Sequence, residues 1–222
     1  NGKLGVMTEN SDNAFMPATI NPFYMVCYSY NGGETKISAD LSSYMNGYQD
    51  PRREIYGVTS TFDESENITN GFHGLRVGNE YPIKTGQCYS NVKVEVSSPI
   101  MWMNAAEVMF LRAEAALRGW DTEKTPKAYY EAGIRLSFEQ LGAKNVEDYL
   151  VSTNTPESYK DPLGTYSFSG TPSTISVQWK DGNFEESLER IITQKWIANF
   201  PLGLEAWAEF RRTGYPKLMG TA

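Results

Sequence analysis

The character of the sequence changes at about residue 104, and this change limits the folds that the chain can adopt. Residues 1 to about 99 carry no helical periodicity and are interrupted repeatedly by proline. From residue 104 onward, apolar residues recur at the three- and four-residue spacing of amphipathic helices. With 222 residues, the chain is long enough to bury a core as one large domain. We therefore expect a mainly α-helical fold, in which 1–99 form a loop-rich lobe with short strands and 100–222 form the helical part.

Two helices that form a hairpin are predicted between residues 104 and 142. The first begins at Asn104, a good capping residue, and ends at Gly119. It carries two apolar stripes, Ala106, Phe110, Ala113 and Leu117 on one side and Val108, Leu111 and Ala115 on the other. We therefore expect this helix to be buried on more than one side. The second begins at Thr125-Pro126 and stops near Gly142, so the short connection makes the pair antiparallel, like one tetratricopeptide unit.

Shorter elements are expected as helices near 41–47, 145–150, 183–200 and 204–213, and as strands at 23–26 and 92–96. A long loop rich in Ser, Thr, Pro and Gly is predicted at 152–182. Aromatic residues at helical spacing are expected in the core, namely Phe110, Tyr130, Phe138, Trp196, Trp207 and Phe210.

Charge and residue content argue against several classes of function. The chain has 20 Lys and Arg against 27 Asp and Glu, so it lacks the clustered cations that bind nucleic acid. His73 is the single histidine, which excludes a multi-histidine metal site, and no calcium-loop or phosphate-loop pattern occurs. No nucleophile motif or distinctive carboxylate pair stands out. We therefore expect a protein that is not an enzyme and has no catalytic residue, metal or cofactor.

The two cysteines leave two alternatives open. Cys27 and Cys88 lie far apart in the sequence, outside any CxxC motif. They can pair in an oxidising compartment or remain two buried thiols, and we favour the thiols.

Aromatic side chains outside the helices are the main positive indication of function, in a chain of which 13% is aromatic. A flat ring with a polar edge can stack on the face of a sugar, and neighbouring polar groups can bond its hydroxyls. Loop aromatics also commonly pin long loops to the body of a protein. The candidate ligand-binding residues are Phe72, His73, Arg76, Tyr81, Tyr166 and Trp179.

Several segments, in order along the chain, resemble the SusD/RagB family. Residues 102–120 are similar to its "AEVxxLRAEAALRG" helix and residues 133–140 to its "GIxxSFEQ" segment. Residues 194–216 resemble "QKWIALF…EAWADYRRTGYP", and Asp50-Pro51-Arg52-Arg53 resembles an upstream "DPR" turn. The resemblance is to the C-terminal portion of such proteins, so we expect this chain to be a fragment.

The resemblance implies a non-catalytic lipoprotein, exposed on the outer membrane of a Gram-negative bacterium. Such a protein binds a glycan and delivers it to a SusC-like TonB-dependent transporter. The lipid anchor that would attach it to the membrane is absent from this chain. Two alternatives remain open: a protein-interaction scaffold that uses the tetratricopeptide-like helices, and a protein that binds peptides rather than glycans.

Overall fold

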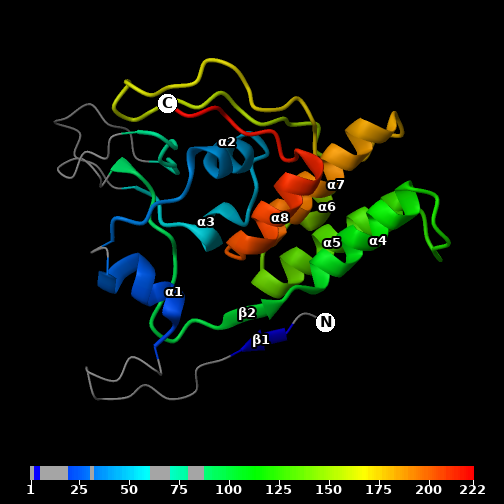
Figure 1. The fold of residues 1–222 in the computed structure, drawn as a ribbon, viewed down its shortest axis with the longest axis horizontal. Coiled ribbons are helices and arrows are strands. Elements are labelled where there is room, and N and C mark those ends of the chain that lie inside the picture. Colours follow the sequence, from blue (N-terminus) through cyan, green and yellow to red (C-terminus); the bar gives the residue numbers. More distant parts are fainter. Residues whose placement is uncertain (1–2, 6–19, 31–32, 61–70, 80–87) are drawn as a thin grey trace.

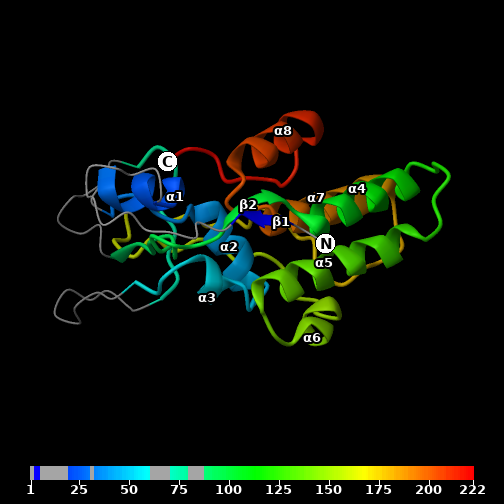
Figure 2. The ribbon, with the colours of Figure 1, turned by 90° about the horizontal axis from the view of Figure 1, so that it is seen from below.

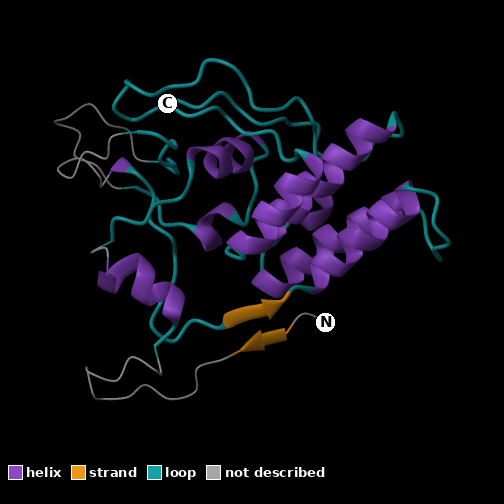
Figure 3. Ribbon diagram, viewed as in Figure 1, coloured by secondary structure: helices purple, strands orange, loops and turns teal. Residues whose placement is uncertain are grey.

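The structure is a computed structural model that describes residues 3–5, 20–30, 33–60, 71–79 and 88–222. Figure 1 shows the longer helices gathered on one side and a lobe of short helices and loops on the other. The elements in chain order are β1 (Lys3–Gly5), α1 (Pro22–Tyr24), the π-helical η2 (Met25–Tyr30), α2 (Ala39–Gly47), α3 (Arg53–Tyr56), β2 (Ile100–Met103), α4 (Ala105–Leu117), α5 (Pro126–Leu141), α6 (Val146–Leu150), α7 (Phe184–Ala198) and α8 (Gly203–Thr213). The expected mainly helical fold is confirmed (Figure 3).

The predicted hairpin is formed by α4 and α5, and its ends follow the local sequence. The side chains of Asn104 and Thr125 each accept a hydrogen bond from a backbone N–H in the first turn that follows. Helix α5 ends at Gly142, whose φ of 69° is left-handed. Close contact between the helices requires Gly133, because a Cβ there would lie 2.8 Å from the ring of Phe110. The hairpin therefore has a tightly packed inner face.

A buried network connects the loop-rich lobe to the helices. Arg52, which follows α2 in the Asp50–Arg53 turn, is fully buried and forms an ion pair with Asp50 at 2.6 Å. Its guanidinium also donates to Ser137 of α5 at 2.9 Å and to Gln194 of α7 at 3.1 Å. Because one side chain satisfies acceptors from three parts of the chain, it fixes the turn against two helices.

Both expected strands are wrong. Residues 23–26 lie in α1 and η2, because Asn21 caps the backbone N–H groups of Phe23 and Tyr24 and Pro22 takes the first helical position. Residues 92–96 form only an isolated bridge, between Val92 and Gly57. A short apolar run does not by itself distinguish a strand from other buried structure. The strands of the described residues are β1 and β2, an antiparallel pair.

Two predictions of burial are also wrong. Val108 and Leu111, from the second apolar stripe of α4, are exposed. So are Trp207 and Phe210 of α8, whereas Phe110 and the other core aromatics expected in α4 and α5 are buried. Helix α4 has the sequence of a helix covered on two sides, and the described residues cover one of them.

The preferred reading of the cysteines is confirmed. Cys27 and Cys88 are both buried and free. Burial raises the pKa of the Cys27 thiol, and it raises the pKa of Cys88 to about 11. Within the described ranges, no helix has both the length and the apolar character needed to span a membrane.

Candidate ligand-binding site

The segment 71–79 carries three of the candidate residues and is fixed by backbone hydrogen bonds. Leu75 donates to the carbonyl of Ile37 at 2.7 Å and accepts from Ala39 at 2.9 Å. Ser90 donates its N–H to the carbonyl of His73 at 2.7 Å, and its hydroxyl accepts from the His73 N–H at 3.0 Å. The backbone of the segment is therefore hydrogen-bonded to residues 37–39 on one side and to Ser90 on the other, which fixes the positions of its Cα atoms.

Arg76 joins three segments that are far apart in the sequence. Its guanidinium donates to the carbonyl of Tyr166 at 3.1 Å and to that of Ser167 at 3.3 Å. It also donates to the carbonyl of Gly220 at 3.0 Å and lies 5.5 Å from the ring centre of Phe168. A planar group with five donors suits this arrangement. Arg76 therefore holds the long loop and the C-terminal residues against segment 71–79; we call these contacts the Arg76 clamp.

Asp161 shapes the loop that presents Tyr166. One carboxylate oxygen accepts from the N–H groups of Thr165 and Tyr166, at 3.0 and 3.1 Å. The other accepts from the hydroxyl of Tyr89 at 2.8 Å, and this hydroxyl is buried. Burial, together with the carboxylate, raises the pKa of Tyr89, so the hydroxyl remains a donor. The backbone of Tyr166 is thus held at its N–H by Asp161 and at its carbonyl by Arg76, and the residue is only partly buried.

The structure brings two of the six candidate residues together. Arg76 and Tyr166 are hydrogen-bonded, and His73 lies on the same segment as Arg76, partly buried. The ring of Phe72 is buried in the core. Trp179 packs against Tyr130 of α5, with ring centres 5.3 Å apart.

Two further points complete the comparison with the expected site. Tyr81 lies outside the described residues. The sequence reasoning missed Asp161, although the turn-forming run Asp161-Pro162-Leu163-Gly164 was a visible signal of a fixed loop at that point.

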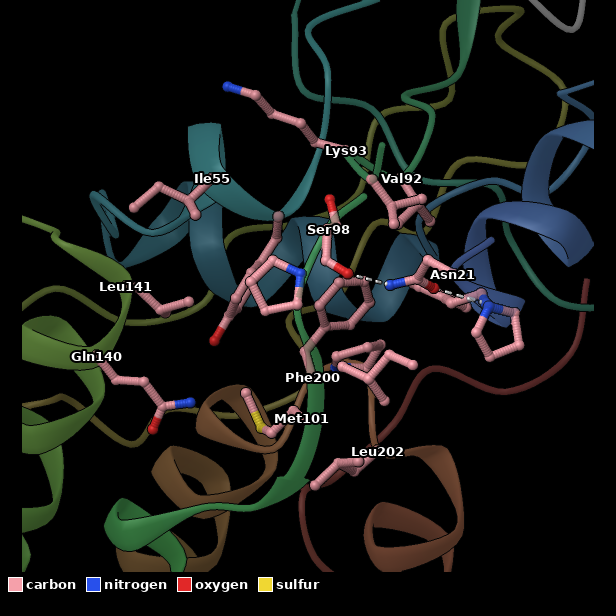
Figure 4. A pocket seen from close by; sticks show the side chains of 17 residues that line it. Asn21, Ile55, Val92, Lys93, Ser98, Met101, Gln140, Leu141, Phe200 and Leu202 are labelled. Atoms are coloured by element: carbon pink, nitrogen blue, oxygen red, sulfur yellow. Dashed lines mark hydrogen bonds between the residues drawn. The ribbon is translucent and has the colours of Figure 1, made fainter. Parts of the chain in front are cut away.

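A second candidate is a pocket of ≈ 420 Å³ between α3, β2 and the end of α7. Figure 4 shows Phe200 within it, and the ring of Tyr56 lies 4.7 Å away from that ring. Two of its polar side chains already have partners: Asn21 donates to the carbonyl of Ser98, and the Tyr56 hydroxyl donates to that of Ile197. The pocket therefore suits an apolar group better than a ligand rich in hydroxyls.

The described residues show no cluster of three His, Cys, Asp or Glu side chains placed to hold a metal ion. The long loop and segment 71–79 together provide a partly exposed aromatic residue, Tyr166, whose backbone is fixed next to the guanidinium of Arg76, with His73 on the same segment as Arg76. Such groups can stack on a flat ligand and form hydrogen bonds to its edge.

The sequence matches the SusD-like family, described as Susd and RagB outer membrane lipoproteins, over residues 1–222. A search of curated protein sequences finds no match. Among solved structures, a SusD homologue from Bacteroides thetaiotaomicron is 44% identical, with a TM-score of 0.83, over 90% of this chain and 42% of its own. One from Bacteroides ovatus is 47% identical, with a TM-score of 0.84, over 91% and 43%.

A chitin-binding SusD homologue from Flavobacterium johnsoniae is also similar. It is 40% identical with a TM-score of 0.81, and the match covers 91% of this chain and 41% of that one. The chain thus spans about two fifths of the length of these relatives.

Proposed function

The chain belongs to the SusD-like family of outer membrane lipoproteins, and on this basis we propose that it binds glycans without catalysing their conversion. The proposed binding surface lies where segment 71–79 meets the long loop 152–182, and it consists of Tyr166, Arg76 and His73. Tyr81 remains a candidate for the same surface. Phe72 and Trp179 are not placed on this surface, because the ring of Phe72 is buried in the core and Trp179 packs against Tyr130 of α5.

The observation that carries this proposal is the Arg76 clamp. It fixes the backbone of Tyr166 and Ser167 before any ligand arrives. Because the backbone that carries the ring of Tyr166 is already ordered, it loses little conformational freedom on binding, so more of the stacking energy of the ring is available as affinity. The similarity to a chitin-binding homologue supports a glycan as the ligand class.

We further propose that the full-length protein acts on the cell surface and passes its glycan to a SusC-like TonB-dependent transporter. Family membership supports the outer membrane as its location. A lipid anchor outside residues 1–222 would attach the protein, and the transporter would be its protein partner.

The direct test is a binding measurement on the full-length protein, with chitin oligosaccharides and a panel of plant, host and microbial polysaccharides. Affinity electrophoresis or calorimetry would give the dissociation constants. We expect Tyr166→Ala to weaken binding about tenfold, which corresponds to about 1.4 kcal/mol. Trp120→Ala is the matched control, because Trp120 is an exposed aromatic residue next to α4, and it should leave binding unchanged.

Each alternative predicts a different result from the same experiment. Binding to a peptide panel, with no glycan bound, would replace the glycan proposal with peptide capture. Capture of a protein through the α4–α5 hairpin, with neither ligand class bound, would favour an interaction scaffold. Release of a shortened product from any glycan would contradict the proposed absence of catalysis.

A further inference from the structure

The guanidinium of Arg76 donates from all three of its nitrogens to backbone carbonyls. Nε and Nη2 donate to Gly220 at 3.3 and 3.0 Å, and Nη2 also donates to Thr221 at 3.4 Å. Nη1 donates to Tyr166 at 3.1 Å and to Ser167 at 3.3 Å. These hydrogen bonds are as many as the N–H groups of a guanidinium. A ligand that bonded to Arg76 would therefore have to displace one of these carbonyls.

The position of Arg76 is also set by an aromatic ring. Its Cζ lies over the ring of Phe168, 5.5 Å from the ring centre, where a cation is stabilised. Phe168 in turn packs against a buried cluster of Ala39, Tyr159 and Met219. Figure 2 shows the chain leaving α8 and ending over the loop-rich lobe, which brings the C-terminal residues to this place. The guanidinium is thus enclosed by groups of the protein itself.

Two buried carboxylates lie close to this arrangement. Asp40 accepts a hydrogen bond from the Met219 N–H at 2.6 Å, one residue before the first carbonyl that Arg76 binds. Asp161 accepts from the N–H of Tyr166 at 3.1 Å, on the other side of the clamp. An anionic group on a ligand would be repelled by these carboxylates, and it would find the N–H groups of Arg76 already bonded.

Tyr166 offers the groups that an uncharged sugar requires. A phenol ring has an apolar face for stacking, and its hydroxyl both donates and accepts hydrogen bonds. The residue is only partly buried, and its backbone is held at the N–H by Asp161 and at the carbonyl by Arg76.

We propose that Arg76 is a positioning residue, which orders the backbone of Tyr166 without bonding the ligand, and that the surface consequently selects uncharged sugars over sugars that carry a carboxylate or a sulfate. The inference rests on the proposed glycan binding and adds the charge class of the ligand to it. It also gives the C-terminal residues a part in binding, because Gly220 and Thr221 hold the guanidinium.

Charge selectivity is tested on the unsubstituted full-length protein. Hyaluronan and polygalacturonate are acidic polysaccharides, and each is compared with its carboxyl-reduced form, which keeps the linkages and replaces every uronic acid by a neutral sugar. We expect a reduced form to bind about tenfold more tightly than its acidic parent, with a dissociation constant that changes little with salt concentration. Binding confined to the neutral members of the full glycan panel would support the inference in the same way.

Two outcomes of this comparison contradict the inference, and they are distinguishable. Equal or tighter binding of an acidic form would overturn the charge selectivity and leave glycan binding intact. No binding to any glycan of the panel would overturn the proposed function, and this inference with it.

The positioning role is tested by binding rates. Loosening the loop lowers the fraction of molecules that can bind, which slows association and leaves dissociation unchanged. We therefore expect Arg76→Ala to slow association with the tightest-binding neutral oligosaccharide of the panel about tenfold. Tyr166→Ala removes a contact and should speed dissociation instead.

Arg135→Ala is the matched control for the rates. Arg135 pairs with Glu147 at 2.7 Å on the surface of α5, so its replacement should change neither rate. Faster dissociation from Arg76→Ala, with unchanged association, would show that Arg76 contacts the ligand itself and would overturn its positioning role.

Discussion

The guanidinium of Arg52 lies 2.6 Å from the carboxylate of Asp50, and both side chains are completely buried. The hydroxyl of Tyr149 donates to the same carboxylate at 2.8 Å, and Arg52 itself lies 4.9 Å from the ring centre of Phe138. The Asp50–Arg52 pair therefore stands at the point where the loop-rich lobe meets α5, α6 and α7.

Replacing Arg52 with Ala should destabilise the protein strongly. The substitution leaves Asp50 buried without its counter-ion, and breaking a buried pair in this way costs about 3–5 kcal/mol. The free energy of unfolding from urea titration measures this loss. Arg53→Ala is the control, because Arg53 is only partly buried and donates to the neutral side chain of Asn46, so about 1 kcal/mol or less is expected. Equal losses for the two variants would show that the buried pair has no special role.

Elements defined by local contacts were predictable from the sequence. Asn104, Thr125 and Asn183 each cap a helix through a backbone group two or three residues away, so neighbouring residues suffice to place them. Arg52 was recognised only as part of a turn. Its role depends on Ser137 and Gln194, which lie far along the chain.

For the candidate site, the sequence predicted which residue types could contact a ligand but not how they lie relative to one another. The sequence singled out Arg76 and Tyr166 as groups suited to a polar, flat ligand, and their proximity comes from loop packing that no local pattern encodes. The sequence also predicted that α4 is buried on two sides. In the described residues Val108 and Leu111 remain exposed, since apolar spacing indicates that a face is covered without indicating which segment covers it.

Replacing Arg76 with Ala should loosen the Arg76 clamp without unfolding the protein. Arg76 is partly exposed, and its partners are backbone carbonyls, so the loss is local. We expect hydrogen exchange of the amides at 165–168 and of Ala222 to speed up about tenfold, which corresponds to about 1.4 kcal/mol and is typical of a lost hydrogen bond. Amides of α4 should be unaffected. Arg76→Lys should restore only part of the protection, because an ammonium cannot match the planar fork. Unchanged exchange at 165–168 would contradict the clamp.

The contact of α8 with α4 should weaken in acid. Burial alone would raise the pKa of Glu114, but hydrogen bonds from Arg212 and Arg118 outweigh it and lower that pKa below the ordinary value. A lowered carboxyl pKa adds stability above pH 4.5, the ordinary value, and this stability is lost as the pH falls through the folded-state pKa.

Glu114→Gln isolates this contribution. At pH 7 we expect a loss of about 1–2 kcal/mol, because both arginines are partly exposed and solvent weakens the pairs. The difference from the unsubstituted protein should shrink below pH 4.5 in urea titrations. Glu123→Gln, in an exposed pair with Arg112, should stay within about 0.5 kcal/mol at every pH. A constant difference for Glu114→Gln across pH would argue against a charge effect.

Asp40 should tolerate replacement by Asn but not by Ala. Its carboxylate is buried in the first turn of α2 and accepts a hydrogen bond from the Met219 N–H at 2.6 Å. Burial raises the pKa of Asp40 above its ordinary value of 3.8, although the bond from Met219 opposes this shift. A raised carboxyl pKa means that the stability it provides is complete below pH 3.8 and is lost as the pH rises through the folded-state pKa. Asn keeps the acceptor oxygen and removes the buried charge, so Asp40→Asn should be at least as stable as the unsubstituted protein at pH 7.

The pH dependence of the two Asp40 variants separates charge from hydrogen bonding. The advantage of Asp40→Asn should decrease toward pH 4, because Asp40 then becomes protonated in the unsubstituted protein. Asp40→Ala removes the acceptor for Met219 and should cost about 1–3 kcal/mol. Thermal unfolding across pH 4–7 measures both variants. If Asp40→Asn destabilised the protein as much as Asp40→Ala at pH 7, a neutral acceptor of the same shape would have failed to replace the carboxylate. The charge of Asp40, rather than its hydrogen bond alone, would then hold the C-terminal residues.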